Sequence, residues 1–239
     1  MAQAPREHLK SFRAEPHGRP VDLELDAFRG GQPDAVGRTD QVEDLLNSIV
    51  NEGLFADVAV VVEGDSDVAA LWAMQTAMDQ KWDELGIVVV PVSGKNNIDR
   101  AVVAFQGFGI PTYFIFDGDK PKNKGATTNR TLLQLGAAAA VDFPATEVNR
   151  GCAVFEDNLE TYLQGIAGER YESLRDKCST QYSYDYSNKA LKNSEVMAMF
   201  LREAHAAGIE FPILQQIVEM ISSIARELRI ASTGTTKPK

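Results

Sequence analysis

The sequence predicts an α/β fold: a doubly wound, mostly parallel sheet with a helical C-terminal subdomain. Three short segments rich in β-branched and aromatic residues, 58–62, 87–90 and 112–116, have the composition of buried strands. Helical patterns at 68–81 and 98–108 separate them. Such alternation is typical of a parallel sheet that carries helices on both faces.

The segments that flank this alternation are assigned in chain order. Residues 1–40 mix Pro, Gly, Arg and Asp without periodicity and are expected to form an extended arm. From residue 41, after Asp40 as a suitable N-cap, the pattern predicts an amphipathic helix that docks on the sheet. Its apolar positions are Val42, Leu45, Leu46, Ile49, Val50 and Leu54. A further helix is expected at 128–139 and a short strand around 153–155.

The last third of the chain is predicted to be helical. Helical patterns cover residues 159–165, 169–178, 195–207 and 211–230, with no clear strand between them. The expected organisation is therefore an N-terminal arm (1–40), an α/β domain (41–165), a helical subdomain (166–231) and a frayed tail (232–239).

Composition is that of an ordinary globular protein, with 44% hydrophobic and 24% charged residues. The net charge of −10 argues against a protein that holds nucleic acid by bulk electrostatics, so DNA binding is expected to be local or metal-assisted. No stretch approaches the roughly 18 apolar residues of a membrane span, and the polar start lacks a secretory core. We therefore expect a cytoplasmic protein without a membrane partner.

Positive charge gathers in two places despite the acidic balance. The first cluster is Lys120, Lys122, Lys124 and Arg130, and the second is Lys177, Lys189 and Lys192. Either cluster can contact phosphates, and a solvated loop is an equally good interpretation of both. The turn Ser93-Gly94-Lys95, between a strand and a helix, is a third place where backbone amides and a lysine can meet a phosphate.

Acidic residues follow three of the predicted strands. Glu63 ends the first strand and Asp67 lies in the first turn of the next helix, while Asp117 and Asp119 flank a glycine after the third. The fourth apolar segment leads into residues 156–160, which include Glu156, Asp157 and Glu160. In open α/β sheets the carboxyl ends of the strands form the active crevice. The acidic residues are therefore expected to meet there.

Converging carboxylates repel one another and resist ionisation unless a cation sits among them. Oxygen ligands select Mg²⁺ or Mn²⁺, with Ca²⁺ as a non-reactive substitute, and this region lacks the His and Cys that zinc prefers. The carboxylates suffice for two ions, the arrangement used in phosphodiester hydrolysis. The alternative is that each is an ordinary turn, helix-dipole or surface residue.

The motifs VVEGDSD, PVSGKNNI and IFDGDK resemble, in order and spacing, those of the Toprim domain. Together with Gly53-Leu54-Phe55-Ala56-Asp57 and Gly94-Lys95-Asn96-Asn97-Ile98, they are most similar to the OLD (overcoming lysogenization defect) family of nucleases. The resemblance covers about residues 45–165. It implies a compact doubly wound domain followed by a helical region.

The resemblance also implies roles for individual residues. Glu63 and Asp67 match the first acidic motif, Asp117 and Asp119 match the DxD pair, and Glu160 matches the later glutamate, with Asp157 or Glu156 as alternatives. It implies two-metal cleavage of DNA, with Lys192 or Lys189 stabilising the transition state.

The predicted function is thus a metal-dependent DNA endonuclease. One departure concerns ATP: OLD nucleases usually carry an ATPase domain, yet the chain has no GxxxxGK[ST] loop. We therefore expect either a stand-alone module, or a fragment or partner of something larger, with a separate ATPase subunit or domain. The helical extension is compatible with a homodimer. Two alternatives remain open, an inactive module for DNA binding or docking, and a phosphoryl-transfer enzyme for a small substrate.

Overall fold

A computed structural model of the chain describes residues 53–122, 125–183 and 187–233. The arm predicted at 1–40, the helix predicted from residue 41 up to residue 52, Lys124 and the last six residues lie outside this part. The predictions made for them are therefore not tested by the structure.

A five-stranded sheet with the order β2-β1-β3-β5-β4 forms the centre of the protein. The four strands β1 (Val58–Val62), β2 (Ile87–Pro91), β3 (Thr112–Asp117) and β5 (Cys152–Phe155) run parallel. The two-residue strand β4 (Glu147–Val148) is antiparallel and closes one edge. The predicted α/β, mostly parallel fold class is confirmed, and only the short β4 was not predicted.

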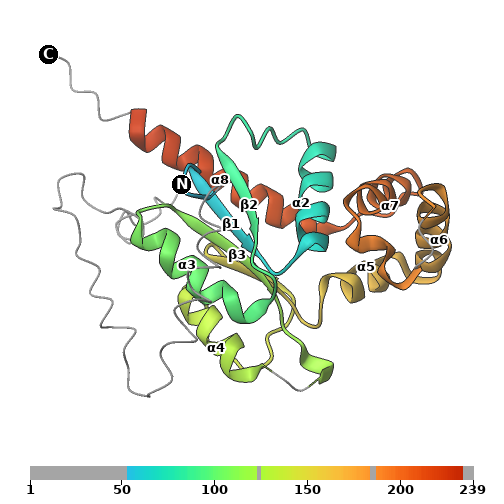
Figure 1. Cartoon of the computed structure of the whole chain (residues 1–239), viewed down its shortest axis with the longest axis horizontal. Coiled ribbons are helices and arrows are strands. Elements are labelled where there is room, and N and C mark those ends of the chain that lie inside the picture. Colours follow the sequence, from blue (N-terminus) through green and yellow to red (C-terminus); the bar gives the residue numbers. More distant parts are fainter. Residues whose placement is uncertain (1–52, 123–124, 184–186, 234–239) are drawn as a thin grey trace, which may run out of the picture.

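Helices cover both faces of the sheet (Figure 1). On one face α2 (Asp65–Ala77) and α8 (Pro212–Thr233) pack against alternate β1 residues that include Val60. On the other face α3 (Ile98–Gly107) and α4 (Ala126–Leu135) pack against the residues between them, such as Val61. Because β1 is buried on both sides, its sequence is continuously apolar instead of alternating.

The remaining helices extend the core on the α2 side. They are α5 (Leu159–Ala167), α6 (Tyr171–Gln181) and α7 (Ser194–Ala206), with short 3₁₀ turns η5 (Gly168–Arg170) and η6 (Ser187–Lys192). A chain of aromatic contacts joins them to the sheet: Phe155 to Tyr162, Tyr162 to Phe211, Phe211 to Phe200 and Phe200 to Tyr171. The helical region therefore shares one apolar core with the sheet.

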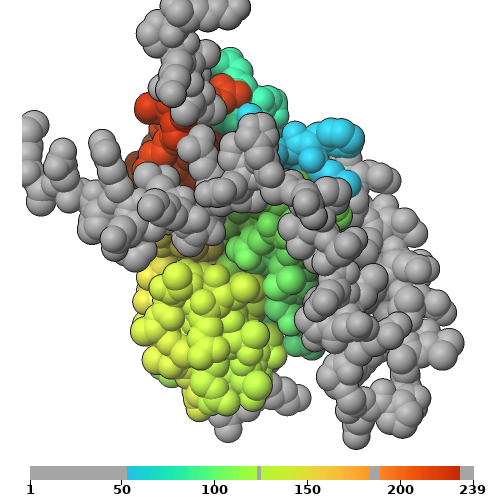
Figure 2. All heavy atoms as spheres, turned by 90° about the vertical axis from the view of Figure 1, so that its left-hand side faces the viewer, coloured from blue at the N-terminus to red at the C-terminus, as the bar shows by residue number. Residues whose placement is uncertain are grey.

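On the opposite face α3 and α4 lie side by side (Figure 2), and a groove runs between them. The groove is open, encloses about 500 Å³, and is lined by Asp99, Arg100 and Val103 of α3 and Thr131, Gln134 and Leu135 of α4. None of the acidic residues that follow the strands lines it. Of the helices in the described ranges, none has the length and apolarity needed to cross a membrane.

A buried hydrogen bond ties α8 to the connection between α2 and β2. The indole of Trp82 is fully buried, packs edge-on against Trp72, and donates from Nε1 to Ser222 Oγ at 2.9 Å. The Ser222 hydroxyl in turn donates to the carbonyl of Val218 at 2.7 Å. This contact fixes the position of α8 against the sheet from a residue 140 positions away in sequence.

Replacing Ser222 with alanine should reduce the free energy of unfolding by about 1–3 kcal/mol, because the Trp82 N–H is then buried without an acceptor. The measurement is urea unfolding followed by far-UV circular dichroism. Ser223→Ala, the next residue of α8 and partly exposed, is the matched control and should change stability by less. Equal effects of the two variants would contradict the assigned role of the Trp82 bond.

Candidate metal centre

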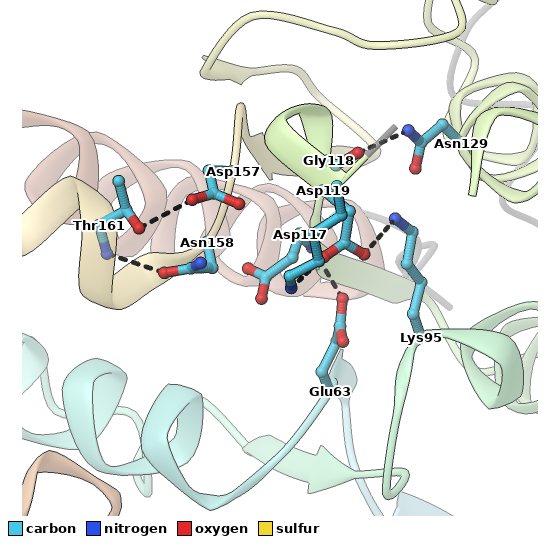
Figure 3. Close-up of polar contacts among 10 residues, drawn as sticks. Glu63, Lys95, Asp117, Gly118, Asp119, Asn129, Asp157, Asn158 and Thr161 are labelled. Atoms are coloured by element: carbon cyan, nitrogen blue, oxygen red, sulfur yellow. Dashed lines mark hydrogen bonds and ion pairs between the residues drawn. The ribbon is translucent and has the colours of Figure 1, made fainter. Parts of the chain in front are cut away.

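Three neighbouring parallel strands bring acidic residues to one edge of the sheet (Figure 3). Glu63 follows β1, Asp117 ends β3, and Asp157 lies just beyond β5. The backbone N–H of Asp117 donates to Glu63 Oε1 at 2.8 Å. The first-strand glutamate and the DxD pair are therefore in direct contact, although 54 residues separate them in sequence.

Main-chain hydrogen bonds attach the DGD turn, residues 117–119, to the connection between β5 and α5. Three consecutive amides donate to carbonyls there: Gly118 to Phe155 (2.7 Å), Asp119 to Asp157 (3.1 Å) and Lys120 to Glu156 (3.2 Å). A Cβ on Gly118 would lie 2.6 Å from the Glu156 carbonyl oxygen, so the approach requires glycine. Asp119 adopts a left-handed conformation (φ 54°), which aspartate tolerates better than most residues.

Asn129 of α4 supports the same turn from the protein interior. Its side chain is fully buried, and Nδ2 donates to the carbonyls of Gly118 (2.9 Å) and Asp142 (2.7 Å), as Figure 3 shows for Gly118. Both faces of the turn are thus held by hydrogen bonds, which leaves its two aspartates little freedom to move apart.

Burial raises the pKa of three carboxyl groups in this cluster. Burial is the largest cause for Asp117, whose pKa rises to about 9, with repulsion from Glu63, Asp67, Glu160 and Asp119 adding to it. The pKa of Asp67 rises to about 7 through burial and repulsion, although the Gly64 N–H bonds its Oδ2 at 3.0 Å. Burial also raises the pKa of Glu63, against opposing bonds from backbone amides.

Asp119 behaves in the opposite way because two lysines pair with it. Burial alone would raise its pKa, but hydrogen bonds from Lys122 to Oδ1 (2.6 Å) and from Lys95 to Oδ2 (3.1 Å) lower it. In Figure 3 its carboxylate points to Lys95, on the side of the site away from Asp157. The two aspartates of the DxD pair are therefore electrostatically different.

The N-terminus of α5 carries the third group of polar side chains. Asn158 is its N-cap and accepts from the Thr161 amide at 2.8 Å, while Thr161 Oγ1 donates to Asp157 Oδ2 at 2.9 Å (Figure 3). The second oxygen, Asp157 Oδ1, is buried without a hydrogen-bond donor among the described residues. A buried carboxylate oxygen without a donor is a candidate ligand for a cation.

Comparison with known proteins assigns this arrangement to a domain family. Residues 54–119, which contain Glu63 and the DGD turn, match the family described as Overcoming lysogenization defect protein-like, TOPRIM domain. Residues 54–119 are an OLD-like Toprim domain. This family relationship indicates a nuclease-type or metal-binding role. None of the curated proteins matches the sequence.

Two solved structures of the C-terminal region of the OLD protein from Xanthomonas campestris pv. campestris have a similar fold. The platinum-phased structure has a TM-score of 0.53 and 18% identity, over 76% of this chain and 100% of that one. The mercury-phased structure gives 0.51 and 18%, over 73% and 98%. Both matches cover more of the chain than residues 54–119. At this identity they show the fold alone.

The donor chemistry of the Toprim site fits a hard divalent cation. All candidate ligands are carboxylate oxygens, several are buried and repel one another, and one buried oxygen lacks a donor. As they stand, no three acidic, cysteine or histidine side chains of the described residues are arranged to hold a metal ion. Binding a cation therefore requires these side chains to converge.

The structure separates the predicted site residues into two groups. The first group consists of acidic residues that lie near enough to shift one another's pKa or that of a common neighbour: Glu63, Asp67, Asp117, Asp119 and Glu160. Asp157 belongs with them because its carbonyl accepts a hydrogen bond from the Asp119 amide. Lys189 and Lys192 are exposed on η6, and no contact between them and these carboxylates is found in the described ranges.

The predicted phosphate-binding residues are distributed unevenly. Gly94 donates its N–H to the Glu63 carbonyl at 2.8 Å, and Lys95 and Lys122 pair with Asp119. Lys120 pairs with Glu156, and Arg130 pairs with Asp142. The basic cluster is thus largely neutralised by neighbouring acids instead of forming an open positive track.

Sequence reasoning missed Asn129 and Thr161, both of which hold site residues. The signal for Asn129 was present, because an asparagine beside Leu132 and Leu133 on the buried side of α4 needs buried partners. Thr161 carries no comparable signal, since a threonine in the first turn of a helix is common.

Replacing Gly118 with alanine should lower the free energy of unfolding by about 1–3 kcal/mol, because its Cβ would force the DGD turn away from residue 156. Urea unfolding measures this. Gly165→Ala in α5 is the control, since a Cβ there meets nothing within 4 Å and alanine favours a helix by about 0.5–1 kcal/mol. Comparable stability of the two variants would be evidence against the tight approach.

The raised pKa values predict how stability depends on pH in EDTA. Between the unfolded pKa near 4 and the folded values of about 7 (Asp67) and 9 (Asp117), the folded chain binds more protons, so stability falls as pH rises. Asp117→Asn should flatten this slope and be more stable than wild type at pH 8.

The measurement is the free energy of unfolding at pH 5, 7 and 9. Asp79→Asn, an exposed aspartate in a turn, is the control and should keep the wild-type slope. Parallel curves for wild type and Asp117→Asn would show that Asp117 is ionised in the folded chain.

Proposed function

We propose that the chain is a metal-dependent endodeoxyribonuclease that hydrolyses DNA phosphodiester bonds at its Toprim site. The observation that carries this proposal is the direct hydrogen bond from the Asp117 amide to Glu63, within a cluster of mutually repelling carboxylates. Folding keeps these groups together at a cost in stability. A metal-dependent activity explains why a chain retains such an arrangement.

The proposed ligands are Glu63, Asp67 and Asp117, with Asp119, Asp157 and Glu160 completing a site for up to two Mg²⁺ or Mn²⁺ ions. Ca²⁺ is expected to bind without supporting cleavage. Bound divalent ions supply positive charge for the phosphodiester and lower the pKa of water. Metal binding would replace the protons that Asp67 and Asp117 otherwise hold, which ties metal affinity to pH.

The chain's own residues provide orientation and phosphate contacts. Glu63 is fixed by the Asp117 amide and lies beside the charge of Lys95, so its carboxylate is oriented before any ion arrives. Lys120 and Lys122 supply exposed ammonium groups at the rim of the DGD turn, and Lys95 supplies a buried one beside it; a DNA phosphate can exchange for their carboxylate partners. The proposed transition-state cation remains Lys192 or Lys189, whereas Lys95 contacts the DxD pair through Asp119.

The proposed partners follow from the same relationship. The solved relatives are described as C-terminal regions of OLD proteins, which supports pairing of this chain with an ATPase subunit or domain. A homodimer and a cytoplasmic location remain predictions from the sequence. The proposed phosphate contacts of Gly94, Lys124 and Arg130 also remain predictions from the sequence.

Purified wild-type chain should nick or linearise supercoiled plasmid with Mg²⁺ or Mn²⁺ but not with EDTA or Ca²⁺, because only the first two ions support hydrolysis. Asp117→Asn should reduce the rate by at least about 100-fold, since it removes a central ligand. Agarose gel analysis of timed reactions measures both effects.

The carboxylate control is Asp79→Asn, which lies in an exposed turn and should cleave like wild type. Absence of cleavage by wild type with every metal, including after addition of an ATPase partner, would favour the docking module. Hydrolysis of a small phosphodiester without any cleavage of plasmid would favour the small-substrate enzyme.

A further inference from the structure

The ammonium group of Lys95 is buried beside the DGD turn. The residue is 9% exposed, and its Nζ lies 3.1 Å from Asp119 Oδ2 and 5.8 Å from the centre of the Phe116 ring. A Cβ on Gly125, at the start of α4, would lie only 3.1 Å from the same nitrogen. A charge enclosed in this way needs an anionic partner, and Asp119 provides it.

The backbone fixes Lys95 in this position. Gly94 has φ of 121°, a conformation that side chains disfavour, and its N–H bonds the carbonyl of Glu63 at 2.8 Å. Asn97 closes the following turn η3 (Lys95–Asn97) by donating from Nδ2 to the Val92 carbonyl at 2.8 Å. Lys95 is therefore held by the same strand ends that carry the carboxylates.

The two oxygens of Asp119 are each engaged by a lysine. Oδ2 accepts from Lys95 and Oδ1 accepts from Lys122 at 2.6 Å. By contrast, the carboxylates of Glu63, Asp67 and Asp117 make no ion pair with a lysine or arginine in the described part of the chain. Once those three side chains converge, a divalent ion can thus bind them without displacing a lysine, but it must displace an ammonium group to bind Asp119.

We propose that Lys95 keeps Asp119 paired, so that a first divalent ion binds at Glu63, Asp67 and Asp117. A second ion then binds at Asp119 only by displacing Lys95. Lys95 is then a positioning residue that sets the order in which the ions bind. This inference rests on the proposed function, because it assumes that the Toprim carboxylates bind metal. Lys122 is the weaker competitor, since it is mostly exposed and its pairing is screened by solvent.

The test is a titration of the full chain with Mn²⁺ alone, without DNA, in which electron paramagnetic resonance counts the free ion. Wild type should bind one ion tightly and a second at least about ten-fold more weakly, because one buried opposite charge shifts cation affinity by a decade or more. Lys95→Met should bind two ions with similar affinity, so the second dissociation constant falls about ten-fold.

Two controls separate this effect from a change in net charge. Lys81→Met removes an exposed lysine paired with Glu84, and it should titrate like wild type. Lys122→Met removes the other partner of Asp119 and should tighten the second ion by less than Lys95→Met does. In the Lys95→Met background, Asp119→Asn should abolish the gained affinity, whereas in the wild-type background it should leave the first ion bound.

Circular dichroism melting confirms that each variant is folded, and Lys95→Gln replaces Lys95→Met if the latter unfolds. If Lys95→Met and Lys95→Gln bind Mn²⁺ with the stoichiometry and affinities of wild type, the proposed role of Lys95 is overturned while the metal site stands. Two equivalent ions in wild type would do the same. No Mn²⁺ binding by wild type and by the Lys95 variants would overturn both this inference and the proposed function.

Discussion

Three main-chain hydrogen bonds from residues 118–120, in and directly after the DGD turn, to residues 155–157 hold together the edge of the sheet that carries the acidic side chains. They involve backbone groups, so they persist whatever the protonation of the aspartates. Gly118 allows the approach and Asn129 supports it from the interior. Because the turn cannot relax outward, the repulsion between its neighbours cannot be relieved by backbone movement.

The repulsion is relieved instead by two different kinds of charge compensation. The pKa values of Asp117 and Asp67 are raised, because both carboxyl groups are buried and face other carboxylates. Asp119, one residue beyond Gly118, stays ionised because two ammonium groups reach it. A DxD pair that appears symmetric in sequence is therefore divided by its surroundings into one aspartate with a raised pKa and one lysine-paired aspartate with a lowered pKa.

Most of the fold was predictable because its strands are buried on both sides. Residues 58–62 are continuously apolar, and this pattern together with the intervening helices identified the parallel sheet. Strand β4 was missed because two residues, Glu147 and Val148, carry no periodicity. The helices after residue 159 were found at nearly their observed bounds, since their apolar stripes face the core that α2 and the sheet provide.

The acidic residues of the site were predictable from the sequence, whereas the pairing of its lysines was less so. Position at a strand end selects Glu63 and Asp117, because topology alone brings neighbouring parallel strand ends together. Which carboxylate each lysine pairs with depends on how far its side chain reaches and on the local backbone conformation. Sequence could not show that Lys120 pairs with Glu156 while Lys95 turns inward to Asp119. The backbone bonds of the DGD turn have no sequence signature apart from the glycine.

The position of Lys95 connects substrate binding with metal binding in the proposed nuclease. A DNA phosphate is an anion that can take over the Lys95 ammonium, and this exchange would free one oxygen of Asp119. This exchange costs less free energy than leaving Lys95 without an anionic partner, because the buried charge remains paired throughout. Under this arrangement the second ion binds most readily when a phosphate is already present, so the complete metal site forms where there is a bond to cleave. A carboxylate cluster with no internal lysine would instead load both ions without DNA, and nothing in it would link loading to substrate.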